Sequence, residues 1–427
     1  MEDKISISLL QRILVENQEA VQKIELSERE LALEAKGNYI FVGPRQAGKT
    51  FCLFQIIKQY IKKYSAKKIL YINFEDDRLL TFNASHFQLL LDAYKSLFKE
   101  TPILFLDEIQ NIDGWEKFSR RLADSKEYKI FITGSNAKML SKEMATTLGG
   151  RYLIKNIYPF SFSEYLAANK VKLTEHWQFS NKRYEIRRKF NDFFKFGGFP
   201  ELLHFKEKRL WLENLYKKVF YGDLIARYKI RNDFALKILV SKLAESIHDE
   251  ISFNRMKNII QSIGTPIGAS TVIEYLNFLE ESFLIFSVKN CLAKITERES
   301  QKKYYFIDNG LITIMQDSPE TKLLENLVAI NLRKQFGSEF YFAKDGAEVD
   351  FYIPQTKTLI QVAYSLSRQT EERELDSMLK IRQKLDAKKM LLITLDEEKT
   401  IEFKGEKIEC IPIWKWVLLK LCNTPQG

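Results

Sequence analysis

The sequence predicts an α/β protein in which a parallel sheet is followed by a helix-turn-helix unit and a second α/β unit. Three observations support this prediction. Short apolar runs that end in polar or acidic residues alternate with helix-like segments over residues 1–158, as in parallel sheets. Two short amphipathic segments and a strand pair follow within residues 235–317. Residues 318–427 again alternate strands with helices.

The composition is that of a globular chain. The 427 residues include 45% apolar side chains, enough for several packed cores. No apolar run approaches the roughly 20 residues that a membrane-spanning helix needs, and the charged N-terminal segment does not resemble a secretory signal. The 4 cysteines lack the spacing of metal ligands. We therefore expect a reduced, cytoplasmic protein that does not associate with membranes.

The segment GPRQAGKT, from Gly43 to Thr50, has the pattern of a phosphate-binding loop between a strand and a helix. Backbone N–H groups of such a loop surround phosphate oxygens, and the helix N-terminus favours an anion. We expect Lys49 to neutralise the β- and γ-phosphates of ATP and Thr50 to hold Mg²⁺. The predicted nucleotide-binding residues are Gly43, Pro44, Arg45, Gln46, Ala47, Gly48, Lys49, Thr50 and Phe51.

A second predicted strand, at 103–106, ends in the carboxylates Asp107 and Glu108. Four apolar residues followed by Asp-Glu form a Walker B motif. Asp107 is expected to orient Mg²⁺ through its water shell, and Glu108 to polarise the water that attacks the γ-phosphate. The two motifs together predict catalysis of ATP hydrolysis rather than ATP binding alone.

A third predicted strand, beginning at Lys129, ends in the polar residues Ser135 and Asn136. Ligands of parallel sheets bind at the carboxyl ends of the strands. Ser135 or Asn136 is therefore expected to reach the γ-phosphate or the attacking water. The alternative is that these residues form a turn and cap the next helix.

Taken together, these motifs resemble those of an AAA-type ATPase family of bacteria and archaea that carries an uncharacterised C-terminal domain. The motifs are GPRQAGKT, the strand ending LDEIQ, TGSN, LGGRY and YPFSFSEYL, in this order. The resemblance implies an ATPase core over residues 1–158, with the P-loop strand central and the Walker B strand beside it, and a helical lid over 159–234. GGFPE at 197–201 resembles the lid motif of signal-transduction ATPases, which implies that Pro200 lies near the adenine.

Arg151 stands at the end of a predicted helix, before the last strand of the core. In ring-forming ATPases an arginine at this place stabilises transition-state charge in the site of a neighbouring subunit. The resemblance thus implies a homo-oligomer, either a ring or a nucleotide-dependent assembly. The alternative is a surface salt bridge. Arg45, inside the loop, is a lesser candidate for phosphate or domain contacts.

Residues 235–317 predict a winged helix-turn-helix, with helices beginning near Ser252 and Ala269 and a strand pair at 283–288 and 302–308. If this unit binds DNA, the second helix enters the major groove and lysines line the wing. The second helix carries no Arg or Lys, however, and winged helices also bind proteins. The candidate DNA-binding residues are Ser270, Thr271, Lys289, Lys302 and Lys303.

Residues 318–427 resemble a restriction-endonuclease-like domain, in which an acidic helix precedes strands with acidic and polar residues. Glu325, Asp350 and Gln361 are the candidate remnants of a metal site. A working site of this kind needs a lysine as well, and the chain has Ala363 where it is expected. The sequence therefore favours a catalytically degenerate domain that contacts nucleic acid or protein.

Three functions follow from these motifs. The first is a Mg²⁺-dependent ATPase that couples ATP binding and hydrolysis to conformational change or assembly on DNA, and the net charge of +10 favours an anionic partner. The second is a regulatory ATPase switch whose C-terminal domains bind a protein. The third, and the least favoured, is an ATP-regulated nuclease.

Overall fold

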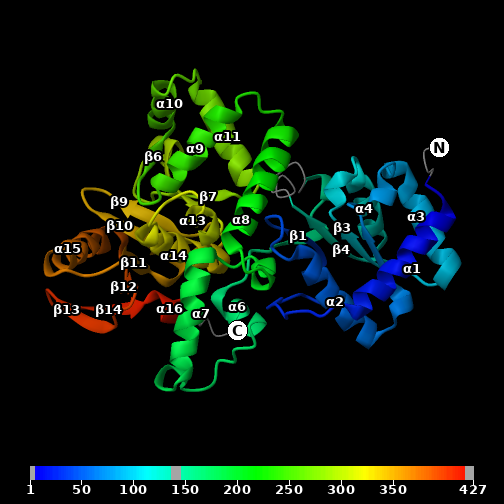
Figure 1. The fold of residues 1–427 in the computed structure, drawn as a ribbon, viewed down its shortest axis with the longest axis horizontal. Helices are drawn as coiled ribbons and strands as arrows, with labels where there is room; N and C mark the ends of the chain where they lie inside the picture. Colours follow the sequence, from blue (N-terminus) through cyan, green and yellow to red (C-terminus); the bar gives the residue numbers. More distant parts are fainter. Residues whose placement is uncertain (1–4, 136–145, 419–427) are drawn as a thin grey trace. The chain divides into compact units, whose positions relative to one another are not determined.

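The computed structural model describes residues 5–135 and 146–418 (Figure 1). The chain forms two compact units that meet in sequence at Pro159. Unit 1 runs to Pro159, and unit 2 begins at Phe160. Each unit has its own sheets and is described separately below.

Unit 1 is built on a five-stranded parallel sheet with the strand order β2-β3-β4-β1-β5. This arrangement confirms the predicted fold class of the core. The expectation that the P-loop strand is central and lies beside the Walker B strand is wrong, because β4 takes the central position between β3 and β1. The P-loop strand β1 lies between β4 and β5. The strands are β1 (Asn38–Val42), β2 (Ile69–Asn73), β3 (Ile103–Asp107), β4 (Lys129–Gly134) and β5 (Tyr152–Asn156).

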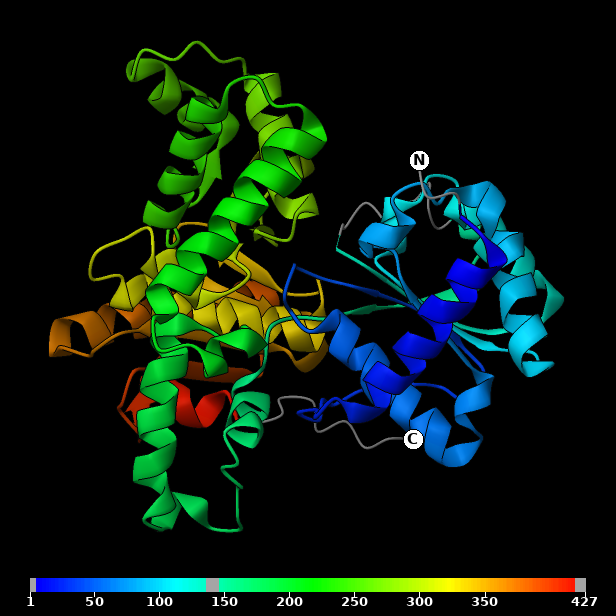
Figure 2. The ribbon, with the colours of Figure 1, turned by 45° about the vertical axis from the view of Figure 1, so that its right-hand side comes forward.

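Helices cover both faces of this sheet (Figure 2). As a consequence, every residue of β3 is buried. On one face, the stacked rings of Phe105 and Phe131, 4.9 Å apart, pack with apolar residues of α2. The helices are α1 (Ile7–Lys23), α2 (Lys49–Lys63), α3 (Phe87–Phe98) and α4 (Trp115–Ser125). Short 3₁₀ turns are η1 (Ala66–Lys68), η2 (Asp77–Leu79), η3 (Ala84–His86) and η4 (Ile109–Asn111).

Unit 2 begins with helices. Ser161 caps α6 and forms a capping box with Glu164. The last of these helices continues into a nine-residue π-helical stretch, η8, a rare geometry that is often found at functional sites. The elements are α6 (Phe162–Ala168), η6 (Trp177–Phe179), α7 (Lys182–Phe196), η7 (Pro200–His204), α8 (Lys208–Lys217) and η8 (Lys218–Ala226).

The glycine motif at the end of α7 is fixed by a later segment of unit 2. Gly198 N donates to Asp308 Oδ2 at 2.8 Å, and Gly310 N donates to Asp308 Oδ1 at 2.9 Å. A Cβ atom on Gly197, which has φ +81°, would lie 1.6 Å from Asp308 Oδ1. Asn309 Nδ2 donates to Phe194 O at 2.9 Å. The short helix α13 (Asn309–Thr313) therefore holds the end of α7 in place.

Three antiparallel strands in the order β6-β8-β7 and four helices follow. This is the order of elements expected of a winged helix, and that assignment stays a prediction. The elements are α9 (Asp233–Glu245), β6 (Ile251–Ser252), α10 (Phe253–Ser262), α11 (Ala269–Glu281), β7 (Ile285–Lys289), α12 (Ile295–Ser300) and β8 (Gln301–Phe306).

The C-terminal part of unit 2 is a mixed six-stranded sheet in the order β13-β14-β12-β11-β10-β9, as expected for an α/β domain. The helices are α14 (Glu320–Phe336), α15 (Arg368–Leu385) and α16 (Ile413–Trp416), with the 3₁₀ turn η9 (Pro354–Thr356). The strands are β9 (Tyr341–Lys344), β10 (Glu348–Ile353), β11 (Thr358–Ala363), β12 (Lys389–Thr394), β13 (Lys399–Phe403) and β14 (Glu406–Pro412). Among the described residues, no helix is long and apolar enough to span a membrane.

Candidate functional site: a P-loop and two carboxylates

The loop between β1 and α2 needs glycine at two positions. Gly43 passes so close to β5 that a Cβ atom would lie 1.9 Å from the carbonyl oxygen of Ile157. Gly48 begins α2 with φ +90°, a left-handed conformation that strains other residues. Gln46 also has a positive φ, of 56°. The backbone therefore curls tightly around the N-terminus of α2, as a phosphate-binding loop does.

Lys49 reaches back over this loop and is only 4% exposed. Its Nζ donates to Gly43 O at 3.2 Å and to Pro44 O at 3.0 Å. The same ammonium lies 3.5 Å from Glu108 Oε1. The P-loop lysine and the Walker B glutamate, predicted from separate motifs, thus meet at one end of the sheet.

Asp107 ends β3 and is completely buried. Its Oδ2 accepts from Tyr71 at 3.1 Å, and its Oδ1 accepts from the hydroxyl of Thr133. Thr50, the other predicted Mg²⁺ ligand, also hydrogen-bonds this carboxylate. Burial raises the pKa of Asp107 to about 6, against the opposing effect of these hydroxyl groups.

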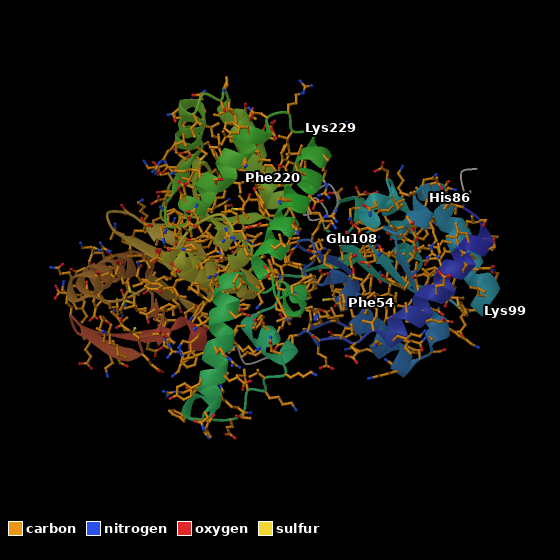
Figure 3. All side chains as sticks on the ribbon, viewed as in Figure 1. Phe54, His86, Lys99, Glu108, Phe220 and Lys229 are labelled. Carbon is orange, nitrogen blue, oxygen red and sulfur yellow. The ribbon has the colours of Figure 1, made fainter. Side chains whose placement is uncertain are left out.

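Glu108 follows directly after β3, in a left-handed conformation with φ +51° (Figure 3). Its backbone N–H donates to Thr133 Oγ1 at 2.8 Å, and its Oε2 accepts from Gln110 Nε2 at 2.5 Å. The Ser135 hydroxyl also hydrogen-bonds this carboxylate. Burial acts to raise the pKa of Glu108, but the Lys49 ammonium and these hydrogen bonds outweigh it and hold the pKa below its usual range.

Three residues of this site were not among the predicted site residues. Thr133 contacts the Asp107 carboxylate and the backbone N–H of Glu108, Tyr71 holds Asp107, and Gln110 joins Glu108 to Ser135, with Gln110 Nε2 3.4 Å from Ser135 Oγ. A signal exists for Thr133 and Gln110, because both are polar residues next to a predicted site residue. The signal for Tyr71 is weaker, because a tyrosine within an apolar strand is expected to serve the core.

Comparison with known proteins places the chain in a family. A family model described as an AAA domain matches residues 36–166. The chain is 36% identical to the uncharacterized protein MJ1544 of Methanocaldococcus jannaschii, across 96% of this chain and 95% of that protein. It is 30% identical to an uncharacterized protein of Haemophilus influenzae, across 89% of this chain and 94% of that protein. The chain belongs to this family of AAA-type P-loop ATPases.

The part of the chain beyond the AAA domain matches two further family models. Both are described as domains of unknown function, DUF8612 over residues 187–322 and DUF4143 over residues 320–416. Among solved structures, the Walker-type ATPase PABY2304 of Pyrococcus abyssi aligns with a TM-score of 0.40 at 15% identity, covering 74% of this chain and 96% of that chain.

The other residues predicted for the ATPase site differ in the contacts that they make. Arg45 pairs with Glu75 at 3.2 Å. Phe51 is exposed on α2, and Pro200 begins η7 in unit 2. Asn136 lies outside the described residues. Arg151 is half-exposed, with its Nε 2.7 Å from Asp124 Oδ1. The ion pair matches the surface alternative for Arg151, while its exposure leaves it accessible to a neighbouring subunit.

The candidate DNA-binding residues differ in exposure. Ser270 is exposed at the start of α11, and Thr271 is partly buried. Lys289 and Lys302 both pair with Glu299, at 2.6 and 3.6 Å. Lys303 is only 1% exposed, so the prediction that it contacts DNA is wrong. Side chains alternate along β8, and this alternation turns Lys303 toward the C-terminal domain.

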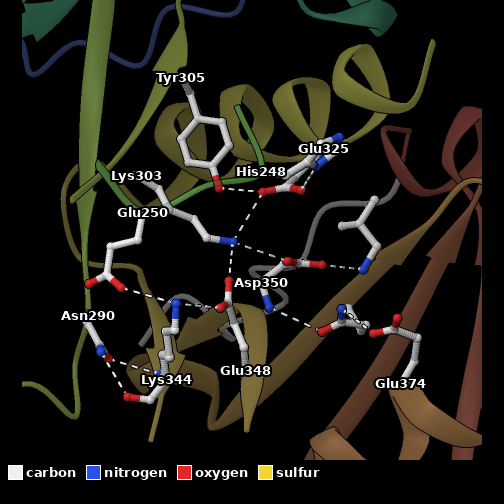
Figure 4. Close-up of polar contacts among 12 residues, drawn as sticks. His248, Glu250, Asn290, Lys303, Tyr305, Glu325, Lys344, Glu348, Asp350 and Glu374 are labelled. Carbon is white, nitrogen blue, oxygen red and sulfur yellow. Dashed lines mark hydrogen bonds and ion pairs between the residues drawn. The ribbon is translucent and has the colours of Figure 1, made fainter. Parts of the chain in front are cut away.

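The three candidate nuclease-like residues lie on α14, β10 and β11 of unit 2, and Figure 4 labels Glu325 and Asp350. Glu325 on α14 and Asp350 on β10 both contact Lys303, at 3.6 and 3.4 Å. Gln361 on β11 accepts from the backbone N–H of Asp350 at 3.2 Å through its Oε1. The sequence prediction therefore identified residues that share one cluster, but it missed the lysine within it.

Proposed function

We propose that this chain is a Mg²⁺-dependent ATPase that couples ATP binding and hydrolysis to a conformational change. One observation carries the proposal: Lys49, Thr50, Asp107 and Glu108 meet at the carboxyl end of the parallel sheet. The residues fit the proposed ligands. Lys49 offers an ammonium beside a tight glycine loop for the phosphates, and Thr50 and Asp107 offer adjoining oxygens for Mg²⁺. Bound Mg²⁺ would neutralise phosphate charge.

The contacts of Lys49 and Glu108 indicate how the chain would respond to ATP. Lys49 now donates to two carbonyl groups of the loop and pairs with Glu108. Phosphate oxygens would compete for this ammonium and release Glu108 to act on a water. Gln110 Oε1, buried with no partner among the described residues, is an acceptor that could hold that water beside Glu108.

The test is ATP turnover and nucleotide affinity, measured on the full chain. We expect Lys49→Ala to lose nucleotide binding. We expect Glu108→Gln to bind ATP but to turn over roughly 10²- to 10⁴-fold more slowly. Lys62→Ala, which changes an exposed lysine near the end of α2, is the matched control and should behave as wild type. Normal turnover by Glu108→Gln would contradict the role proposed for that residue.

DNA is the partner proposed first, on the basis of the net charge of +10. The role of the ATPase would then be assembly or movement on DNA. The test is fluorescence anisotropy of labelled duplex and single-stranded DNA across a salt series. Binding through phosphates should weaken linearly with the logarithm of salt concentration, and Lys289→Ala should reduce the slope. Absence of binding at low salt would remove this partner.

A protein partner is the second candidate, and the surface of α11 favours it. The exposed side chains of this helix include Ile273 and Glu274 but no lysine or arginine. Lys289 and Lys302 of the predicted wing are both partly buried, and both pair with Glu299. Ile273→Asp should then abolish recovery of a partner protein without changing ATP turnover. If Ile273→Asp leaves that partner bound, α11 is not the contact surface.

A further inference from the structure

A buried lysine lies at the centre of three carboxylates in unit 2, two of them buried and the third partly exposed (Figure 4). Lys303 Nζ lies 2.8 Å from Glu348 Oε1, 3.4 Å from Asp350 Oδ1 and 3.6 Å from Glu325 Oε1. The ammonium also lies 5.5 Å from the centre of the Phe342 ring, which favours a cation. Three carboxylates from two elements, α14 and β10, therefore surround one ammonium group from a third, β8.

The carboxylate of Glu325 has its other positions occupied. Its Oε1 also accepts from the Tyr305 hydroxyl at 2.7 Å, and its Oε2 contacts His248 Nδ1. Tyr305 and Lys303 are two residues apart on β8, so they face the same side of the strand. Lys303 and Tyr305 thus both reach Glu325 from the same face of β8.

Asp350 and Glu348 are also engaged. Asp350 Oδ2 accepts from the backbone N–H of Val362 at 2.9 Å, and Glu348 Oε2 lies 3.2 Å from Lys344 Nζ. Gln361, a possible weak metal ligand, turns its oxygen to the backbone of Asp350 and donates through its Nε2 to Glu374 at 2.7 Å. Its amide therefore serves β10 and α15.

A divalent cation does not fit these residues. A nuclease-like site would hold the cation where Glu325 and Asp350 converge, and the Lys303 ammonium lies at that point. Among the described residues, no group of three or more His, Cys, Asp or Glu side chains is arranged to hold a metal ion. The buried carboxylates already have a counter-ion, as buried charges require.

We propose that the Lys303 ammonium takes the place of the divalent cation in this nuclease-like site, so that the C-terminal domain neither binds a metal at Glu325 and Asp350 nor cleaves nucleic acid. The positive charge at this site is then supplied by a side chain of β8 and not by a bound metal ion. The cluster then serves to join the β7–β8 strand pair to the C-terminal sheet.

One alternative uses the same contacts differently. A nuclease of this type needs a lysine beside its metal-bound carboxylates, and Lys303 would be that lysine if a cation bound next to it. The two interpretations make opposite predictions. If the site is an active nuclease, replacing Lys303 abolishes metal-dependent cleavage. If the Lys303 ammonium stands in for the metal, replacing Lys303 lets the site bind one.

The experiment measures Mn²⁺ binding to the nucleotide-free full chain by electron paramagnetic resonance, together with the shift in melting temperature on adding Mn²⁺. We expect Lys303→Met to gain one Mn²⁺ and to be stabilised by it, and Lys303→Met/Asp350→Asn to lose both effects. Lys302→Met is the matched control, because Lys302 is the neighbour of Lys303 on β8 but pairs with Glu299. Wild type and this control should show neither effect.

Two results would overturn the proposal. One is failure of folded Lys303→Met to gain a Mn²⁺ ion. The other is Mn²⁺ binding or Mn²⁺-dependent DNA cleavage by wild type that Asp350→Asn removes. The second comparison does not depend on Lys303→Met, which leaves buried carboxylates unpaired and so risks unfolding. Asp350→Asn keeps the Lys303 contacts with Glu325 and Glu348, so we expect this variant to fold and to allow the comparison with wild type.

Discussion

At the scale of single residues, the candidate ATPase site depends on Thr133, to which the sequence motifs assigned no role. Thr133 joins the two Walker B residues, because its hydroxyl donates to the Asp107 carboxylate and accepts from the backbone N–H of Glu108. The first bond orients the Asp107 carboxylate, the proposed Mg²⁺ ligand, and the second supports the left-handed backbone of Glu108. Thr133 is thus a positioning residue for both proposed functions of the motif.

Thr133→Val keeps the shape of the side chain but removes both hydrogen bonds. We expect turnover to fall by about 10- to 100-fold and the Mg²⁺ concentration for half-maximal activity to rise, because Asp107 is no longer oriented. ATP turnover across a Mg²⁺ series checks this. Thr133→Ser, which retains the hydroxyl, should recover most of the activity, and a valine variant with an unchanged Mg²⁺ requirement would rule out the positioning role.

His248 gives unit 2 a pH-dependent contribution to stability. Burial acts to lower its pKa, but the hydrogen bond and charge of Glu325, with the charge of Asp350, outweigh burial and the opposing Lys303 charge and raise the pKa. A base whose pKa rises on folding stabilises the fold below its unfolded pKa, and this stabilisation is lost as pH rises through the folded pKa.

His248→Gln should therefore lower the melting temperature at pH 6 and have less effect at pH 8.5. Melting curves of the two proteins at both pH values test this expectation. Glu325 would still keep its bonds to Lys303 and Tyr305, so the fold should survive. An equal difference at the two pH values would show that the charge of His248 does not contribute.

At the scale of elements, the end of α7 and the start of α13 form one joint. Gly197 touches Asp308 so closely that no side chain fits, and Gly310 N and Gly198 N share the same carboxylate. Burial raises the pKa of Asp308 to about 6, against the effect of these two N–H groups. The glycine motif, for which the resemblance implies a place in a lid, has in unit 2 a structural partner more than a hundred positions away.

Gly197→Ala should destabilise unit 2 by about 2–4 kcal/mol, the sum of a strained positive φ and a clash with Asp308. Gly264 is the matched control, because it has the same φ of +81° with nothing within 4 Å of the added Cβ. Gly264→Ala should cost only the strain, about 1–2 kcal/mol. Denaturant unfolding of both variants measures the difference, and equal losses would exclude the clash.

The elements that local patterns define were the ones predictable from sequence. In unit 1, β3 ends at Asp107 of the Walker B motif and β4 ends directly before Ser135. The faces of strands were not predictable. Lys302 and Lys303 are chemically identical neighbours on β8, and only the packing of α14 and β10 decides that the second is buried. From the charge pattern alone, both lysines were predicted to lie on the surface of the wing.

At the scale of the whole molecule, the open question is assembly. Arg151 is half-exposed on unit 1, paired with Asp124 and near Gly149. An exposed arginine can leave such a pair at little cost, because surface salt bridges contribute about 0–1 kcal/mol. The pair is thus compatible with a role of Arg151 in a neighbouring subunit, which stays a prediction.

Arg151→Ala should bind ATP normally and lose turnover if the residue acts in a neighbour. Mixing this variant with Lys49→Ala should then restore part of the activity, because mixed assemblies contain intact composite sites. ATP turnover and light scattering with and without ATP provide the measurements. Asp124→Ala, which removes only the surface partner, is the control, and absence of rescue in the mixture would argue against action between subunits.

The contacts of β8 have a practical consequence for dissecting the chain. A cut between residues 317 and 318 would separate Lys303 from all three of its carboxylates and Phe306 from Asn326, whose side chain bonds both backbone groups of that residue. The C-terminal fragment would carry an excess of buried negative charge, and the preceding fragment an exposed apolar strand. Since Asp308 also binds Gly198, the whole of unit 2, from residue 160 onward, is best inherited as a single block in recombination between relatives.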